Sequence, residues 1–403
     1  MKVVIAPDSF KECLRAPDVA AALAEGVLAA AVDAQIDLCP MADGGEGTVG
    51  AMVAATGGST RTADVFDPLG KPVRAHWGLL GTSRAAGLPG ELGFSGAMGR
   101  MEGAEPAGAG PRRGVVEMAA ASGLGLVPPQ MRDPLRTTTY GTGQLLLAAV
   151  DDGCEEIVVG IGGSATVDGG CGAAQALGVR FPDADGQECI RGLAGGGLAD
   201  IAEIDLSGRD PRLNDVRLRI ACDVMNPLTG AEGAARVYAP QKGATPEVVR
   251  GLENALERLA ALIHGVTGQD VGTLTGGGAA GGLGAGLVAF AGATLERGAN
   301  LVAEAVGLRQ RLAGADLCVT GEGRLDAQTG SGKTAFAVAR ICREEGVPVV
   351  CVPGRADDGA PDAFDAVLPL AAGEVDEREA LRNPTHWLAQ RAAEAVAGGR
   401  WPG

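Results

Sequence analysis

Short apolar runs near both ends of the chain dominate its hydrophobic pattern. Each run has five or six residues and is typical of a strand that is buried on both faces. Helical stretches alternate with these runs, which predicts an α/β fold with a doubly wound parallel sheet built from both termini. The five runs are residues 2–6, 35–39, 316–320, 348–352 and 365–370.

A long segment between the second and third runs indicates an insertion. We expect residues 1–61 and 296–403 to form one discontinuous domain, and residues 62–295 to form a second α/β domain. Within the insertion, residues 155–161 predict a strand. A helix is expected to begin after Thr245, an N-cap residue, because an apolar stripe follows at helical spacing: Val248, Leu252, Leu256, Leu259 and Ile263.

Composition narrows the class of protein. The chain has 66 Gly among 403 residues and only 3% aromatic residues, which favours an aliphatic core with many tight turns. A net charge of −16 argues against nucleic acid or an anionic membrane as a partner. Residues 84–113, rich in Gly, Ala and Pro, predict a mobile surface loop.

The cysteines and the start of the chain bear on its compartment. Nine cysteines without a C-x-x-C pair are expected to be reduced thiols, mostly buried. The chain begins with a strand, and it lacks both the apolar stretch of a signal peptide and a segment long enough to span a bilayer. We therefore expect a cytoplasmic protein, either a monomer or a homodimer.

Charged residues gather in the loops that follow the first three apolar runs. Because ligands of open α/β sheets bind beyond the carboxyl ends of the strands, these loops are the expected site. Carboxylates beside Lys and Arg suit phosphoryl transfer, which needs oxygen ligands for Mg²⁺ and cations near the moving charge. The residues are Asp8, Lys11, Asp43, Glu46, Glu322, Arg324 and Asp326.

A second candidate region lies within the insertion, where a strand runs into a Gly-Gly-Ser loop and then into a helix. This arrangement offers backbone and hydroxyl donors to a phosphate from Gly162, Gly163, Ser164 and Thr166, with Asp168 placed to reach metal or substrate. Weaker signals come from residues in nearby turns: Asp223, Asn226, Lys242 and Gly277.

Several enzyme classes are excluded by missing patterns. The three histidines, His76, His264 and His386, lack zinc-ligand spacing, and no G-x-S-x-G elbow is present. The first strand is followed by residues 7–10, Pro-Asp-Ser-Phe, where a dinucleotide-binding fold needs glycines. Zinc hydrolases, serine hydrolases and nicotinamide dehydrogenases are therefore disfavoured.

The stretch "AQTGSGKT" at residues 327–334 satisfies a relaxed P-loop pattern. A P-loop starts directly after a strand, but here "GEGRLD" follows the strand at 316–320 and precedes Ala327. We expect a connector leading into a helix, with Lys333 as a phosphate contact. A P-loop NTPase that uses residues 327–334 remains an alternative.

Long motifs along the chain resemble those of the glycerate kinase family of bacteria and plants: "APDSFKECL", "PMADGGEGT", "TTTYGTG", "GIGGSATVDGG", "CDVMNPLTG", "PQKGATPE" and "TGEGRLDAQT". The resemblance implies a flavodoxin-like domain from both termini, a second α/β domain and an active site between them. It also implies phosphorylation of D-glycerate with ATP and Mg²⁺, with 2-phosphoglycerate favoured as product. Val167 departs from the family, which generally carries Asn there.

These roles define a mechanism to test. We expect the glycerate hydroxyl to face Asp8 or Asp43, and ATP phosphates to lie on the loop from Gly162 to Thr166 with Lys242 and Lys333 nearby. Ser9, Lys11, Arg132 and Arg324 are expected to bind the substrate. Mg²⁺ is expected on some of the following: Asp43, Glu46, Asp168, Asp223, Glu322 and Asp326. A non-catalytic protein that binds a small hydroxy acid remains another alternative.

Overall fold

The computed structural model describes residues 1–11, 13–81, 110–189, 192–326, 333–357, 362–373 and 375–398. Most of the loop expected at 84–113 lies outside these ranges, as do residues 327–332 of the P-loop-like stretch.

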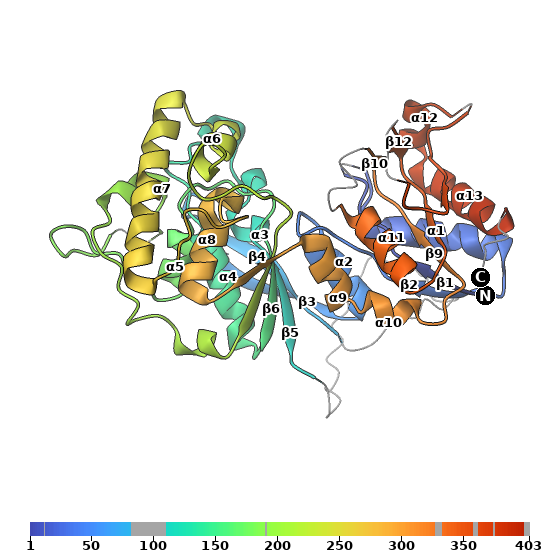
Figure 1. The fold of residues 1–403 in the computed structure, drawn as a ribbon, viewed down its shortest axis with the longest axis horizontal. Helices are drawn as coiled ribbons and strands as arrows, with labels where there is room; N and C mark the ends of the chain where they lie inside the picture. Colours follow the sequence, from blue (N-terminus) through green and yellow to red (C-terminus); the bar gives the residue numbers. More distant parts are fainter. Residues whose placement is uncertain are drawn as a thin grey trace.

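One parallel sheet joins the two ends of the chain (Figure 1). Its strand order in the described part of the chain is β13-β11-β9-β1-β2, the flavodoxin-like order, with Ile5 paired to both Leu38 and Val319. All five predicted runs contain one of these strands, so the predicted fold class is confirmed. The strands are β1 (Lys2–Ile5), β2 (Gln35–Leu38), β9 (Leu317–Thr320), β11 (Val349–Cys351) and β13 (Ala366–Val367).

A second sheet lies in the insertion, with order β3-β4-β5-β6-β7-β8 over the described residues. The first three strands are antiparallel to one another, and the strands from β5 to β8 are parallel. β6 confirms the strand predicted at 155–161. The strands are β3 (Ser59–Phe66), β4 (Pro72–Leu79), β5 (Arg113–Glu117), β6 (Glu156–Gly160), β7 (Arg217–Ala221) and β8 (Thr294–Glu296); β10 (Arg324–Leu325) and β12 (Arg355–Ala356) pair separately.

The helix cap predicted at Thr245 is confirmed, because its side chain accepts a hydrogen bond from Val248 N at 3.4 Å before α7. Gly346 adopts a φ of 70° just after α11, as is common at the end of a helix. The helices are α1 (Ala16–Ala30), α2 (Thr48–Thr56), α3 (Ala119–Ser122), α4 (Tyr140–Asp151), α5 (Cys171–Ala176), α6 (Ala234–Tyr238), α7 (Pro246–Thr267), α8 (Ala279–Ala291), α9 (Gly298–Ala305), α10 (Leu308–Leu312), α11 (Thr334–Glu344), α12 (Glu377–Arg382) and α13 (Pro384–Ala397).

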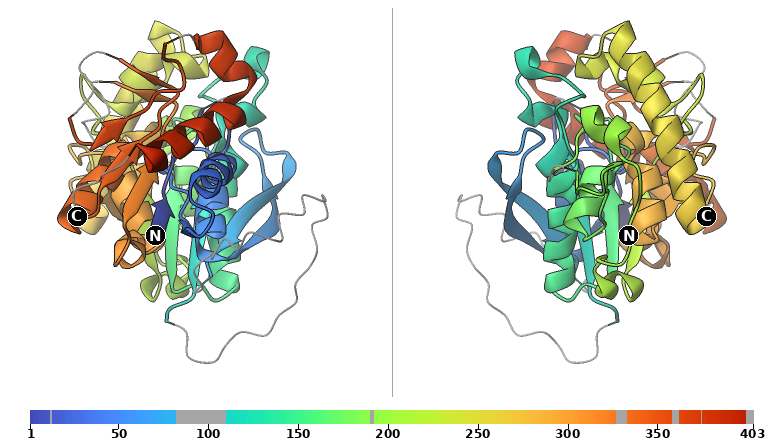
Figure 2. Two further views of the ribbon diagram at one scale, coloured as in Figure 1. Left: turned by 90° about the vertical axis from the view of Figure 1, so that its right-hand side faces the viewer. Right: turned by 90° about the vertical axis from the view of Figure 1, so that its left-hand side faces the viewer.

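Helices fill the space between the two sheets. In Figure 1, α2, α9 and α10 lie between the sheets, while α1 and α13 cover the outer face of the first sheet. Viewed from either end of the long axis, α1 and α13 face the viewer on the side of the first sheet, and α7 faces the viewer on the opposite side (Figure 2). One buried cluster contains Val4 of the first sheet, Met52 of α2, Leu301 of α9 and Val158 of the second sheet. The two sheets therefore share a continuous core, and the domain boundaries at 61 and 296 stay predictions.

The side chains also bear on two other predictions. All nine cysteines lie in the described ranges and are free thiols, and six of them are buried. Of the helices that the structure describes, none combines the length and apolar character needed to cross a membrane.

Candidate active site

Asp8 lies just after β1 and is held by the loops around it. Its backbone N–H donates to the carbonyl oxygen of Gly321 at 2.8 Å, which joins the loops after β1 and β9. Its carboxylate accepts hydrogen bonds from Thr334 Oγ1 and from the backbone N–H of Ser9, both at 2.6 Å. Asp8 is therefore fixed where β1 and β9 diverge, which is the topological switch point of the sheet.

Asp43 follows β2, and the second sheet holds its loop in place. One carboxylate oxygen accepts from Gly45 N at 2.8 Å, and the other lies 3.7 Å from Lys11 Nζ. The loop leads into α2, whose N-terminus is capped by Glu117 at the end of β5. Glu117 accepts from Val49 N at 2.6 Å and from Gly47 N at 3.2 Å.

The second sheet adds Asp223 after β7. Its Oδ1 accepts from Gly298 N at 2.9 Å, at the start of α9. A side chain at position 298 has no room, because a Cβ there would lie 1.9 Å from the carbonyl oxygen of Asp43. Gly162 N also donates to Gly44 O at 3.3 Å, so loops from both sheets meet at one edge. We call Asp8, Lys11, Asp43 and Asp223 the carboxylate rim.

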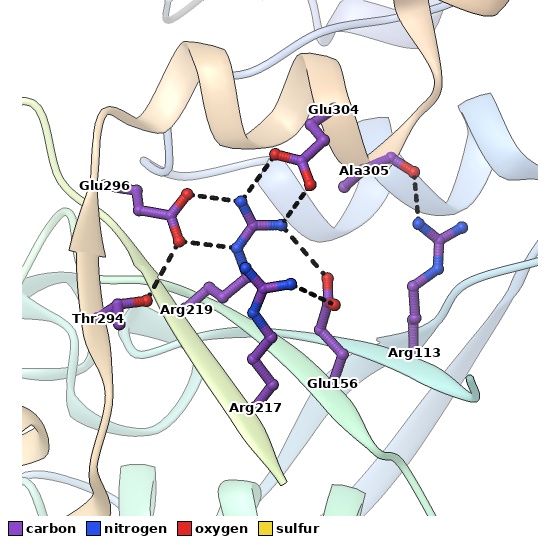
Figure 3. Close-up of polar contacts among 8 residues, drawn as sticks. All are labelled: Arg113, Glu156, Arg217, Arg219, Thr294, Glu296, Glu304 and Ala305. Carbon is purple, nitrogen blue, oxygen red and sulfur yellow. Dashed lines mark hydrogen bonds and ion pairs between the residues drawn. The ribbon is translucent and has the colours of Figure 1, made fainter. Parts of the chain in front are cut away.

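An ion-pair network attaches α9 to the second sheet and so fixes this edge (Figure 3). Arg219 of β7, with 3% of its surface exposed, donates from Nε to Glu296 at 2.7 Å and from Nη1 to Glu304 of α9 at 2.9 Å. Glu156 of β6 lies 3.5 Å from the same guanidinium. Because a buried guanidinium with several carboxylate partners has a fixed geometry, α9 presents Gly298 to Asp223 in one position.

The rim carries uncompensated negative charge. Burial raises the pKa of Asp8 to about 6, and the charge of Asp43 adds to this effect. Burial also raises the pKa of Asp223 to about 6, with Asp43 adding and Arg297 opposing the shift. The raised pKa values of Asp8 and Asp223 mark a place where a cation or a proton is favoured.

The rim offers carboxylates that could serve as ligands of a hydrated divalent cation. Within the described ranges, no group of three or more His, Cys, Asp or Glu side chains is arranged to hold a metal ion. Mg²⁺ usually keeps several waters and takes only one or two carboxylates together with substrate phosphates. The rim supplies carboxylates of this kind from Asp43 and Asp223.

Asp168 differs from the rim carboxylates in its surroundings. It is fully buried and accepts hydrogen bonds from Thr139 N and Oγ1, both at 2.7 Å, and from Gly170 N and Gly172 N at 3.1 and 3.3 Å. Burial raises its pKa, and these hydrogen bonds oppose the shift. The sequence predicts a catalytic or metal-binding role, but the structure places Asp168 inside the glycine-rich loop, where it orders backbone.

Lys242 supports the same loop from inside. Its Nζ donates to Ser164 Oγ at 2.6 Å and to the carbonyl oxygen of Thr166 at 2.7 Å, and only 1% of the residue is exposed. Burial lowers the pKa of Lys242 to about 7, although Asp168 opposes the shift. Thr166 is also buried, so Gly162, Gly163 and Ser164 are the part of the predicted phosphate loop that reaches the surface.

A left-handed turn at the start of α8 packs against this loop. Ala280 has a φ of 54°, and Gly281 and Gly282 are also left-handed. A Cβ at Gly281 would lie 1.9 Å from the carbonyl oxygen of Thr166, which explains the glycine. Gly277, which the sequence places in a turn, is buried and its N–H donates to the carbonyl oxygen of Leu274.

In the loop after β9, two residues that the sequence predicts for the site, Arg324 and Asp326, form ion pairs. Lys333 Nζ donates to Asp326 at 2.9 Å, just before α11, and Arg324 Nε donates to Asp357 at 2.7 Å. β9 ends at Thr320, and residues 321–326 with the two-residue strand β10 separate it from the P-loop-like stretch, which therefore does not follow directly on a strand of the first sheet. This context agrees with a connector.

The remaining predicted residues lie around the rim loops. Glu46 is exposed on the Asp43 loop, and Glu322 is buried after β9. Asn226 accepts from Tyr238 Oη at 2.7 Å and donates to the carbonyl oxygen of Glu232 at 2.9 Å, which shapes the loop after β7. Arg132 lies beside Gly243, next to Lys242.

Sequence reasoning missed several residues that build the site. Thr334 orients Asp8, Glu117 caps the Asp43 loop, Thr139 holds Asp168, and Arg297 lies near Asp223. Thr139 belongs to the motif "TTTYGTG", which carried the family resemblance without an assigned role. Thr334 ends the stretch "AQTGSGKT", but no sequence pattern indicated its contact with Asp8 or the contact of Glu117 with the Asp43 loop, because these partners lie far away in the sequence.

A parallel sheet with carboxylates and a lysine at its carboxyl edge, facing a glycine-rich loop, defines an α/β phosphotransferase. The sequence profile of the glycerate kinase family matches residues 3–398. The chain belongs to this family, and it is a kinase that uses ATP as phosphate donor.

Individual relatives cover nearly the whole chain. A glycerate kinase from Halalkalibacterium halodurans is 43% identical over 99% of this chain and 98% of its own length. A glycerate 2-kinase from Escherichia coli K12 is 45% identical, with 94% and 93% covered. The crystal structure of a candidate glycerate kinase 2 from Salmonella typhimurium LT2 aligns with a TM-score of 0.84 at 45% identity, over 99% and 98% of the two chains.

Proposed function

We propose that this chain transfers the γ-phosphoryl group of ATP to D-glycerate and forms 2-phosphoglycerate in the cytoplasm. The observation that carries the proposal is the meeting of Asp8, Lys11 and Asp43 with Asp223 and the Gly162 loop at one edge. Membership of the glycerate kinase family supports the substrate, and the name of the Escherichia coli relative supports the 2-position.

Asp8 is the base in this proposal, because Thr334 and Ser9 orient its carboxylate at the switch point. The 2-hydroxyl oxygen of glycerate forms a bond to the γ-phosphorus, and the bond to the β,γ-bridging oxygen breaks. The hydroxyl proton passes to the carboxylate, and ADP leaves. Lys11, next to Asp43, stabilises the negative charge of the transferring group.

The glycine-rich loop offers donors to the γ-phosphate from Gly163 and Ser164, while the N–H of Gly162 is bonded to Gly44 and Lys242 supports the loop through Ser164 Oγ. Arg132 is assigned to the glycerate carboxylate, because its Nε is buried and meets no hydrogen-bond acceptor among the described residues. Asp43 and Asp223 would hold Mg²⁺, which screens phosphate charge when bound. Glu46 and Asp223 are both exposed, and Asp223 is preferred because the N–H of Gly298 fixes its carboxylate.

Phosphorus NMR of the protein with D-glycerate, ATP and Mg²⁺ tests this function. We expect a 2-phosphoglycerate resonance that grows with ADP, and none with L-glycerate. A 3-phosphoglycerate resonance would contradict the assigned hydroxyl. ATP hydrolysis without glycerate would favour the NTPase alternative, and binding of glycerate without turnover would favour the non-catalytic one.

A further inference from the structure

A pocket of about 230 Å³ lies at the carboxyl edge of the first sheet, beside the rim. Loops after β1, β9, β11 and β13 form its floor, and α12 and the start of α13 form its wall. Four strand ends that converge on one pocket make it the expected ligand position of a flavodoxin-like sheet. No step of the phosphoryl transfer described above uses its wall.

The wall is mostly apolar. Phe10 and Leu370 are buried against the sheet, and Ala380, Leu381 and Pro384 come from the C-terminal helices. Leu381 keeps 64% of its surface exposed and adjoins Ala380 and Pro384 in the pocket lining, so apolar surface there is open to a ligand. Glycerate cannot use such a wall, because each of its three carbons bears oxygen. An aromatic base can, since it has two apolar faces.

The size of the pocket limits what it holds. Pockets for a complete drug-sized ligand measure roughly 300–1,000 Å³. At about 230 Å³, this pocket suits one part of a nucleotide, and the rest of the molecule must extend outside. The rest of the nucleotide is expected to extend past Lys11 toward the rim, because Lys11 lines the pocket and its Nζ lies 3.7 Å from the carboxylate of Asp43.

Two arginines at the pocket are fixed by a shared carboxylate. Asp357 accepts from Arg324 Nε at 2.7 Å and from Arg355 Nε at 2.8 Å, and Arg355 also pairs with Glu377. Their guanidinium groups therefore hold one position beside the apolar wall, where they suit a ribose hydroxyl or the first phosphate. This position differs from the glycerate contact that the sequence predicts for Arg324.

We propose that this pocket binds the adenine ring of ATP, an assignment that rests on the proposed kinase function. The triphosphate extends past Lys11, and its γ-phosphoryl group reaches the junction of the Asp43 and Gly162 loops, where Gly162 N meets Gly44 O at 3.3 Å. The two substrates thus come from opposite sides of the rim. ATP lies on the first sheet, and glycerate lies on the side of Arg132.

Leu381→Glu tests the pocket, and Val32→Glu is its matched control. Val32 has 80% of its surface exposed and lies in the loop between α1 and β2, at the opposite edge of the sheet. We expect Leu381→Glu to raise KM for ATP at least about tenfold while KM for D-glycerate stays within about twofold. Val32→Glu should leave both constants unchanged. Equal KM values for ATP in the two variants would overturn the assignment.

Leu381→Lys separates apolar contact from charge. If the leucine contacts the adenine ring, both substitutions weaken the binding of ATP, and inorganic tripolyphosphate inhibits all variants equally. If Leu381→Lys instead strengthens the binding of ATP, the effect is electrostatic and the assignment is wrong. Each variant is expected to fold, because the side chain is mostly exposed.

Calorimetry with adenosine distinguishes this inference from the proposed function. The wild-type protein should bind adenosine, and Leu381→Glu should not. If the protein binds adenosine in this way but makes no phosphoglycerate, the pocket assignment is supported and the kinase function is refuted. If it makes phosphoglycerate while adenosine fails to compete with ATP, the kinase function is supported and the pocket assignment is refuted.

Discussion

The carboxylate rim and the glycine-rich loop differ in burial and in hydrogen bonding. Asp168 of the loop and Lys242 beneath it are buried, Asp168 accepts four hydrogen bonds, and Lys242 donates two. At the rim, Asp8 and Asp43 are half-buried and Asp223 is exposed. Asp8 accepts two hydrogen bonds and Asp223 accepts one, and the charge of Asp43 adds to desolvation in raising the pKa of both. A charged group whose hydrogen bonds are all made within the protein stabilises the fold, whereas a charged group with few such bonds can still bind a ligand. The following predictions test this difference.

The largest effect is expected at the rim. Asp8→Asn removes the proposed base and should lower kcat about 10²–10⁴-fold, because general base catalysis contributes about this much. The melting temperature should not fall, because the substitution removes a buried charge. Coupled measurement of ADP release checks the rate, with the exposed Asp64→Asn as control. A kcat within threefold of the wild-type value would remove Asp8 from this role.

Asp168→Asn should show the opposite pattern. Its amide replaces an acceptor that serves four donors, so we expect a loss of about 2–4 kcal/mol in the free energy of unfolding. Urea denaturation measures this loss, and kcat should fall less than in Asp8→Asn. A variant of normal stability with a rate as low as that of Asp8→Asn would make Asp168 catalytic and would end the distinction.

The rim should also respond to pH and Mg²⁺. The pKa of Asp8 and of Asp223 is raised from 3.8 to about 6, so the folded state holds protons more tightly than the unfolded chain. Stability without metal should therefore fall as pH rises from about 4 to 6. Mg²⁺ should raise the melting temperature more at pH 7.5 than at pH 5, since it binds ionised carboxylates. An equal shift at both pH values would contradict this site.

The smallest effect is expected for Lys242, where stability should change with pH in the direction opposite to that expected for the rim. Its pKa is lowered from 10.5 to about 7, so the unfolded chain binds the proton more tightly between these values. Stability should rise as pH increases above 7, because the folded state then holds neutral lysine. Lys242→Met should lose this rise, which urea denaturation at pH 7 and 9 measures. Parallel pH profiles for the two proteins would rule out the lowered pKa.

Much of the fold could be predicted, because its strands are continuous apolar runs and its loops follow them in order. The same logic led to the predictions for Asp8 and Asp43, since strand ends of a parallel sheet share one edge. It could not show that Asp168 accepts four hydrogen bonds and Lys242 donates two, because a sequence shows a charge without showing its partners. It also missed Thr334, whose contact with Asp8 spans 326 positions.

The pairing of β1 with β9 has a consequence for biosynthesis. Val3 pairs with Leu317, so β1 has no neighbour on that side until the ribosome has made most of the chain. At about 5–20 residues per second, this takes roughly 15–60 s. Throughout that time the first strand is an apolar segment with one open edge, exposed to aggregation. Nascent chains stalled before residue 317 should therefore be strong clients of holdase chaperones.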